Sequence, residues 1–465
     1  MSNQPFGFSI PGDDDPAGAH DPATGPSSFD LSQLGSMLSQ LGQMMSQAGA
    51  KGQTGPVNYD LARQMAMSQV PASHPVASVD LGAVRDAMAL AEVWLDGVTA
   101  FPIGATTVTA WTPREWIDKT MPVWERLASP IAERVSQAWV EGLPDEARAQ
   151  AGPLLAMMGS MGGMAFGSQL GQGLAQLAVE VLTSTDIGLP LGPEGTAALL
   201  PRAMAELSAS LDVPEDQVRL YLAAREAAHH RLFRHVPWLS DRIVELISAY
   251  AGAITVDFSA MEELASSIDL SNPASVESAL SKGMFEPSAT VGQQRALTTL
   301  ETLLALVEGW VDAVVADAVG ARLPGADALH ETMRRRRATG GPAEQTFATL
   351  IGLQLRPRRL RAAADLWRGL KASRGINGRD ALWAHPDLLP ATADLDDPAA
   401  FIARDREFAE LLADAGDWGD GTSVDDKDGV GSDAGGPAGT DDADSDADGP
   451  QDADGAGSDA GGTAG

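Results

Sequence analysis

Apolar residues recur at helical spacing through most of the chain from Val213 onward, and this pattern constrains the fold more than any other feature. Asp212 and Glu215 stand three residues apart, as in a capping box. Pro214 suits a first helical turn, and Pro237 stops the helix. The sequence therefore predicts a mainly α fold. Further helices are expected from near Ser240 and over Gln293–Val319, Ala326–Ala338 and Pro342–Ser373, with an interruption at Pro357.

One short segment, TDIGLPLGPEG, is apolar and bounded by Gly and Pro, so it predicts at most a small extended or β element at a cleft edge. The stretch before it has no charged residue between Ala149 and Val179 and repeats small residues at spacings of three and four. A membrane helix can show such a face, but glutamines and serines dilute the apolarity of this one. We expect a buried helix packed closely through its glycines, and no transmembrane segment.

The two ends of the chain differ in composition from its middle. Residues 1–30 are rich in Gly, Pro, Asp and Ser, and residues 414–465 hold 15 Asp and one Lys, a net charge of −14. Such segments bury too little apolar surface to offset their ordering entropy. The sequence therefore predicts a disordered N-terminus over 1–30, a short amphipathic helix and linker over 31–79, a helical domain over 80–410 and a disordered acidic tail over 411–465.

Composition also excludes several classes of function. The formal net charge of −32 argues against nucleic acid as a partner, because a binder of phosphate backbones needs a basic face. The chain has no cysteine, so disulfides, thiolate catalysis and cysteine-bound zinc are excluded, and any metal must be held by His, Asp or Glu. The start, MSNQPFGFSIPGDDD, lacks the basic and apolar regions of a signal peptide, so a cytoplasmic location is expected.

The stretch YLAAREAAHHRLFRHVPWL resembles the helix of a zinc protease. Such a helix reads His-Glu-x-x-His, because two imidazoles one turn apart grip one ion while the Glu between them reaches the metal-bound water. Here Glu226 and His229 occupy the second and last positions, and His230 follows. Arg225 stands at the first position, where an arginine cannot act as a ligand because it stays protonated.

Several segments together resemble an actinobacterial family of zincin-like, zinc-dependent metalloproteases or hydrolases, some of whose members are associated with biosynthesis of a deazaflavin cofactor. The resemblance covers roughly Asp80 to Phe401 and excludes both tails. The segments that carry it are GGMAFGSQLGQGLAQLAVEVL, GLPLG, REAAHHRLFRHVPWL, LLALVEGWVDAVV, MRRRRATGGPAEQTFATLIGLQLRPRRLR and GRDALWAHPDLLP.

The resemblance implies a zincin-like helical metalloprotease fold and a set of site residues. By position, Glu226 corresponds to the catalytic base and His229 to the second zinc ligand, whereas Arg225 stands at the first ligand position. Glu308, in LVEGWVDAVV, looks like the acidic third ligand, with Asp312 one turn further on. Zinc is the cofactor implied, and a peptide or protein is the implied substrate.

The substitution at Arg225 leaves three outcomes open. In the first, Arg225 crosses the vacated site and pairs with Glu308 or Asp312, which gives a catalytically inactive protein. In the second, a metal remains in a rearranged shell of Glu226, His229 and Glu308, completed by His230 or Asp312. In the third, the imidazoles make only local hydrogen bonds, and Glu226 pairs with Arg225 or Arg231.

A basic island stands out in this acidic chain. It comprises the run Arg334, Arg335, Arg336 and Arg337, and RPRRLR over Arg356–Arg361. These side chains could receive a phosphate or carboxylate, or hold the acidic tail, or form solvated helix faces with internal salt bridges.

We expect one of two functions. The first is a metalloprotease-like hydrolase that cleaves a peptide or amide bond, with Glu226 as base and His229 and Glu308 as ligands. The second is a catalytically inactive zincin-like binding or scaffold protein. The oligomeric state is left open by the sequence.

Overall fold

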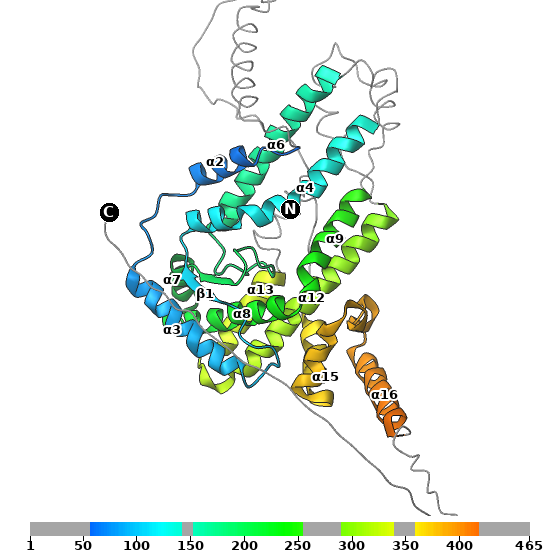
Figure 1. Cartoon of the computed structure of the whole chain (residues 1–465). Coiled ribbons are helices and arrows are strands. Elements are labelled where there is room, and N and C mark those ends of the chain that lie inside the picture. The colour runs from blue at the N-terminus through cyan, green and yellow to red at the C-terminus, as the bar shows by residue number, and fades with distance from the viewer. Residues whose placement is uncertain (1–55, 142–151, 254–289, 339–358, 418–465) are drawn as a thin grey trace, which may run out of the picture. The chain divides into compact units, whose positions relative to one another are not determined.

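The computed structural model describes residues 56–141, 152–253, 290–338 and 359–417 (Figure 1). Helices dominate these residues and two short strands accompany them, so the expected mainly α fold is confirmed. The expected segment 1–30, residues 31–55 of the amphipathic segment, residues 342–358 of the last expected helix and the tail beyond 417 lie outside the described residues. The helices are Tyr59–Gln69 (α2), Ser78–Leu95 (α3), Pro113–Glu141 (α4), Gly152–Ala178 (α6), Pro201–Leu211 (α7), Glu215–His235 (α8), Trp238–Gly252 (α9), Val291–Val319 (α12), Ala326–Ala338 (α13), Leu360–Asp380 (α15) and Pro398–Asp417 (α16).

The sheet is small. Strands Thr107–Ala110 (β1) and Thr196–Leu199 (β2) run parallel, with Thr107 opposite Thr196. On the other edge of β2, residues 182–184 add a short antiparallel bridge, in which the amide of Ser184 donates to the carbonyl of Ala198 at 2.8 Å. The extended element thus flanks TDIGLPLGPEG rather than filling it, because Gly188 and Gly195 adopt positive φ and turn that segment.

Helices α8 and α12 form the centre of the molecule. Every residue from Tyr221 to Leu232 in α8 and from Thr302 to Val315 in α12 is buried. The two helices pack on each other, while α3 also covers α8 and both α9 and α15 also cover α12 (Figure 1). A helix that is buried on all sides has no solvated face, so each charged residue in its middle needs a partner inside the protein.

The helix boundaries test the sequence expectations. Helix α8 begins at Glu215, two residues later than expected, and the expected capping box is wrong, because Asp212 adopts a φ of 53° and ends α7 in the left-handed conformation. Asp tolerates that conformation better than most residues. A capping box does occur at the start of α12, where Thr290 and Gln293 cap each other. Helix α9 starts at Trp238, and α13 has the expected bounds.

Helix α6 shows the expected close packing through glycine. A Cβ on Gly167 would lie 2.4 Å from the carbonyl oxygen of Asn58, and one on Gly171 would lie 2.5 Å from that of Ala62 in α2. Only glycine lets the two backbones approach this closely. Within the described ranges, no helix combines the length and apolarity that a membrane crossing would need.

The chain divides into a unit of residues 1–410 and a unit of residues 411–465. In the second unit, the described residues are 411–417, at the end of α16.

Candidate functional site

Helix α8 carries five buried ionisable side chains in a single stretch. Arg225, Glu226, His229, His230 and Arg231 are each at most 6% exposed. Because successive helix residues point about 100° apart, these side chains reach different neighbours. They contribute to two polar clusters and to a contact with α3, and a third cluster forms around Asp312 of α12.

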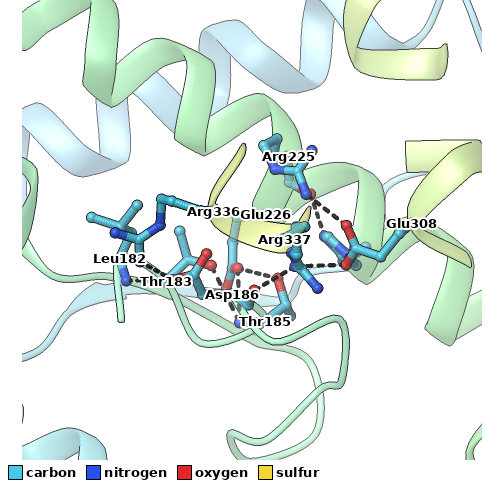
Figure 2. A network of polar contacts seen from close by, with 10 residues as sticks. Leu182, Thr183, Thr185, Asp186, Arg225, Glu226, Glu308, Arg336 and Arg337 are labelled. Carbon is cyan, nitrogen blue, oxygen red and sulfur yellow. Dashed lines mark hydrogen bonds and ion pairs between the residues drawn. The ribbon is translucent and has the colours of Figure 1, made fainter. Parts of the chain in front are cut away.

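The first cluster forms around Glu308 of α12. Nη2 of Arg225 lies 2.8 Å from Oε2 of Glu308, and Nε2 of His229 lies 3.0 Å from Oε1. A third side chain, Arg337 of α13, contacts the same Oε1 at 2.8 Å. Figure 2 shows both guanidinium groups directed at this carboxylate. Burial by itself would raise the pKa of Glu308, but the charges of Arg337, His229 and Arg225 outweigh it and hold that pKa well below its usual range.

Both ring nitrogens of His229 lie against oxygen atoms. Nδ1 is 2.9 Å from the backbone carbonyl oxygen of Arg225, which can only accept, so Nδ1 donates. Nε2 lies 3.0 Å from Oε1 of Glu308. In this arrangement Nε2 of His229 is occupied by its contact with Glu308.

Glu226 belongs to a second cluster, on the sheet side of α8. Its carboxylate accepts from the amides of Ala198 at 3.0 Å and Thr185 at 3.2 Å, from the hydroxyls of Ser184 and Thr185, and from Nε2 of His230 at 3.3 Å. Burial alone would raise the pKa of Glu226, but hydrogen bonds and charge from His230, with the hydroxyls of Ser184 and Thr185, lower it to about 2. Glu226 therefore fastens α8 to β2 and to residues 184–185.

A third cluster surrounds Asp312, one helical turn beyond Glu308. Its Oδ1 lies 2.5 Å from Nε2 of His330 in α13, and its Oδ2 lies 3.2 Å from Nη2 of Arg368 in α15. Asp312 thus ties α12 to two neighbouring helices. His330 and Arg368 had no place among the sequence-based site residues, because neither carries a motif and both lie outside α8 and α12.

The arginine run of α13 is partly used inside the protein. Arg336 donates to the carbonyl oxygen of Glu180 at 3.0 Å and lies 3.4 Å from Oδ2 of Asp186. Arg337 donates to the carbonyl oxygen of Asp186 as well as to Glu308 (Figure 2). Arg335 pairs with exposed Glu331 one turn earlier. The last two arginines of the run therefore hold the loop of residues 180–188 against α12.

Gly188 allows this loop to approach Glu308. It has a φ of 82°, and a Cβ placed on it would lie 2.7 Å from Oε1 of Glu308 and 3.3 Å from Nη1 of Arg337. Both the backbone conformation and the space require glycine here. The sequence signal that could have identified this loop is the motif Thr-Ser-Thr-Asp-Ile-Gly over residues 183–188. Its hydroxyl groups donate to Glu226, and its glycine forms the turn beside Glu308.

Arg231 has no part in these clusters. It contacts Glu92 and Asp96 of α3 at 2.6 Å each and donates to the carbonyl oxygen of Phe101 at 2.9 Å. This arginine joins α8 to α3 and to the segment that follows it.

The donor set does not fit zinc in this arrangement. A zinc ion takes three or four lone pairs from His, Asp or Glu in tetrahedral geometry. The expected ligands meet in two separate pairs, His229 with Glu308 and His230 with Glu226, and two guanidinium groups already occupy the carboxylate of Glu308. His230 turns to Glu226, and Asp312 to His330 and Arg368. Among the described residues, no three His, Asp or Glu side chains are grouped so that they could hold a metal ion.

Comparisons with known proteins give one family and one solved structure. Residues 57–402 match the sequence profile of a family described as zincin-like metallopeptidase. The chain is similar to the crystal structure of a protein from Chloroflexus aurantiacus, provisionally named a hydrolase with a novel fold, at a TM-score of 0.51 and 20% identity over 75% of this chain and 98% of that one. At this identity the likeness concerns the fold alone. No curated protein matches the chain.

Proposed function

Because the chain belongs to the zincin-like metallopeptidase family, we propose that it is a metal-free member of that family, one that keeps the scaffold and acts by binding rather than by hydrolysis. Fold alone does not set activity, so the proposal depends on the side chains at the site.

The observation that carries the proposal is the occupation of Glu308 by two guanidinium groups. Arg225 and Arg337 together bring two positive charges to the carboxylate, the same charge that a zinc ion would bring. A guanidinium fork also matches a carboxylate in shape, and Arg is more weakly hydrated than Lys, so it suits a buried pair. The two guanidinium groups thus compensate the charge of Glu308 and satisfy its oxygen atoms, as a bound metal would.

The environment of Glu226 supports the same conclusion. A general base works best with a pKa near the operating pH and with an oxygen free to take a proton. Glu226 has a pKa of about 2, and its two oxygens receive five hydrogen bonds. A role that ties α8 to β2 and to residues 184–185 accounts for four of those bonds, and the fifth comes from His230 of the same helix.

The competing proposal is a hydrolase with a rearranged metal shell. To form it, Arg225 and Arg337 would have to leave Glu308, and the loop that Arg337 holds would have to move. Removing both cations would leave the buried carboxylate without a guanidinium partner unless a metal arrived at the same time.

Metal content tests the proposal directly. The full chain would be dialysed against zinc and then against buffer, and its zinc measured by elemental analysis beside His229→Ala. We expect well under one zinc per chain in both proteins, and no cleavage of casein or of a mixed peptide pool. Near-stoichiometric zinc in the unaltered chain that disappears in His229→Ala would overturn the proposal in favour of the hydrolase.

A further inference from the structure

Strand β1 pairs with β2 along one edge, and its other edge, here called the outer edge, has no strand beside it among the described residues. Parallel pairing with β2 uses the backbone of Thr107 and Trp111, whose amides donate to Gly195 and Leu199 at 3.0 and 2.9 Å. Since alternate residues of a strand point their backbone groups to opposite edges, the amide and carbonyl of Val108 point outward. Within the described part of the chain, β2 is the strand partner of β1. The edge is also accessible, because Thr106 and Thr107 are exposed.

A pocket of about 410 Å³ lies along this edge, between β1 and α3. Its apolar lining comes from Met88 and Ala89 of α3 and from Ile103, Ala105 and Val108.

Further apolar surface continues from the pocket. Ile103 is 56% exposed, and Val93, one turn beyond Ala89 on α3, is 67% exposed. An open strand edge beside an apolar groove is the arrangement on which extended peptides dock by adding a strand.

The charged residues at the groove indicate which charge a docked peptide would carry. The lining holds Arg85 and Glu92, but Glu92 is already paired with Arg231 at 2.6 Å. Arg85 is exposed, and its contact with the carbonyl oxygen of Val108 is long, at 3.5 Å. The groove therefore presents one exposed positive charge, which makes a long contact with the outward carbonyl oxygen of Val108.

We propose that the groove between β1 and α3 docks an extended segment of another protein, with apolar side chains at alternate positions and a carboxylate that meets Arg85. The segment pairs its backbone with Val108, and its apolar side chains cover Ile103 and Val93. This edge lies across the sheet from residues 182–184, so it is separate from the Glu308 cluster, and the proposal does not depend on the absence of zinc.

The test uses the full chain and a random decapeptide library displayed on phage. An enriched decapeptide would be synthesised with a fluorescent label, and its affinity measured by anisotropy. We expect the enriched sequences to alternate apolar residues and to contain Asp or Glu. We also expect the bound peptide to slow hydrogen exchange of the Val108 amide.

Two variants separate edge pairing from other binding. Val108→Pro removes the outward amide while leaving the β1–β2 hydrogen bonds, because proline is tolerated on a strand edge. Arg85→Glu reverses the charge. Each should weaken the peptide about tenfold or more, since a hydrogen bond or a charge pair at the docked strand is lost. Two controls should bind the peptide nearly as the unaltered chain does. Val108→Ala keeps the amide, and Val291→Asp changes a valine of α12 that is 64% exposed, close to the 67% of Val93.

Several outcomes would overturn the proposal. One is that the library yields no enriched peptide. Another is that the enriched peptides bind Val108→Pro and Arg85→Glu as tightly as they bind the unaltered chain. Slow exchange of the Val108 amide in the free protein would instead assign the edge to another segment of the same chain. Protection that appears only at high protein concentration would assign it to a second copy. If Val108→Pro fails to fold by circular dichroism, Arg85→Glu and Ile103→Asp carry the test.

Discussion

Arg225 and Glu308, 83 positions apart in the sequence, meet at 2.8 Å in the centre of the molecule, with side chains that are 7% and 3% exposed. The pair occupies the position where the family resemblance implies a metal ligand and its acidic partner. Glu308 also has Arg337 as a partner, so the loss of Arg225 would leave its charge partly compensated, whereas the loss of Glu308 would leave two buried cations facing each other.

Loss of the Glu308 carboxylate should destabilise the fold strongly. Glu308→Gln leaves Arg225, Arg337 and His229 around a neutral group, and we expect a loss of about 3–5 kcal/mol in the free energy of unfolding. Urea unfolding followed by circular dichroism measures it. The matched control is Glu194→Gln, which removes the exposed pair with Arg234 and should cost about 1 kcal/mol or less. Equal effects at the two sites would contradict the buried-pair interpretation.

Glu226→Gln should lower stability rather than any hydrolytic rate. The substitution puts an amide NH₂ where Glu226 now accepts hydrogen bonds from Ala198, Ser184 and Thr185, so donors would face a donor. We expect a loss of about 1–3 kcal/mol. A double-mutant cycle of Glu226→Gln with Ser184→Ala measures the interaction between these two side chains, and we expect that interaction to stabilise the fold. A catalytic base would behave in the opposite way, with activity lost and stability kept or gained.

Acidification should remove part of the stability through Glu226. Its pKa is lower in the folded chain, at about 2, than its ordinary value of 4.5, so the carboxylate stabilises the fold above pH 4.5. That contribution, on the order of 3 kcal/mol, falls away as the pH drops from about 4.5 toward 2. Unfolding free energies measured across this range should show a shallower slope in Glu226→Gln. An unchanged slope would mean that Glu226 has the same pKa in both states.

Gly188→Ala should destabilise the loop at the cluster. The alanine would need a φ of 82°, and its Cβ would meet Oε1 of Glu308 at 2.7 Å, so we expect a loss of about 1 kcal/mol or more. Gly82→Ala in α3 is the control, because nothing lies within 4 Å of its Cβ, and there alanine should stabilise by about 0.5–1 kcal/mol. Thermal unfolding of both variants gives the comparison, and a gain in both would contradict the close approach of Gly188 to Glu308.

Metal affinity should appear when the two cations are removed from Glu308. Arg225→His restores an imidazole one turn before His229, and Arg337→Gln frees the remaining oxygen of Glu308. We expect Arg225→His to bind zinc weakly and the double variant to bind it about tenfold or more tightly than the single one. Isothermal titration with zinc measures both. Absence of zinc binding in the double variant would mean that the positions of His229 and Glu308 cannot serve a metal.

Local sequence pattern was sufficient to predict several of the helices of this protein. Apolar spacing predicted α13 to its bounds, and Pro237 marked where α8 ends. These features are set by residues close together in the chain, through backbone hydrogen bonds and the burial of one helix face. Where a single residue could serve either of two helices, as Asp212 does, local pattern alone misassigned it.

The pairing of the buried charges depends on how the helices pack. The sequence left Arg225 with Glu308, with Asp312 or with Glu226 as partner, and left Glu226 as a base, a ligand or a local pair. The packing of α8 on α12 brings Glu308 to Arg225, while β2 and residues 184–185 enclose Glu226. The reason is physical: a buried charge takes the partner that helix packing places within hydrogen-bond reach, and that placement depends on contacts made by many residues far away in the chain.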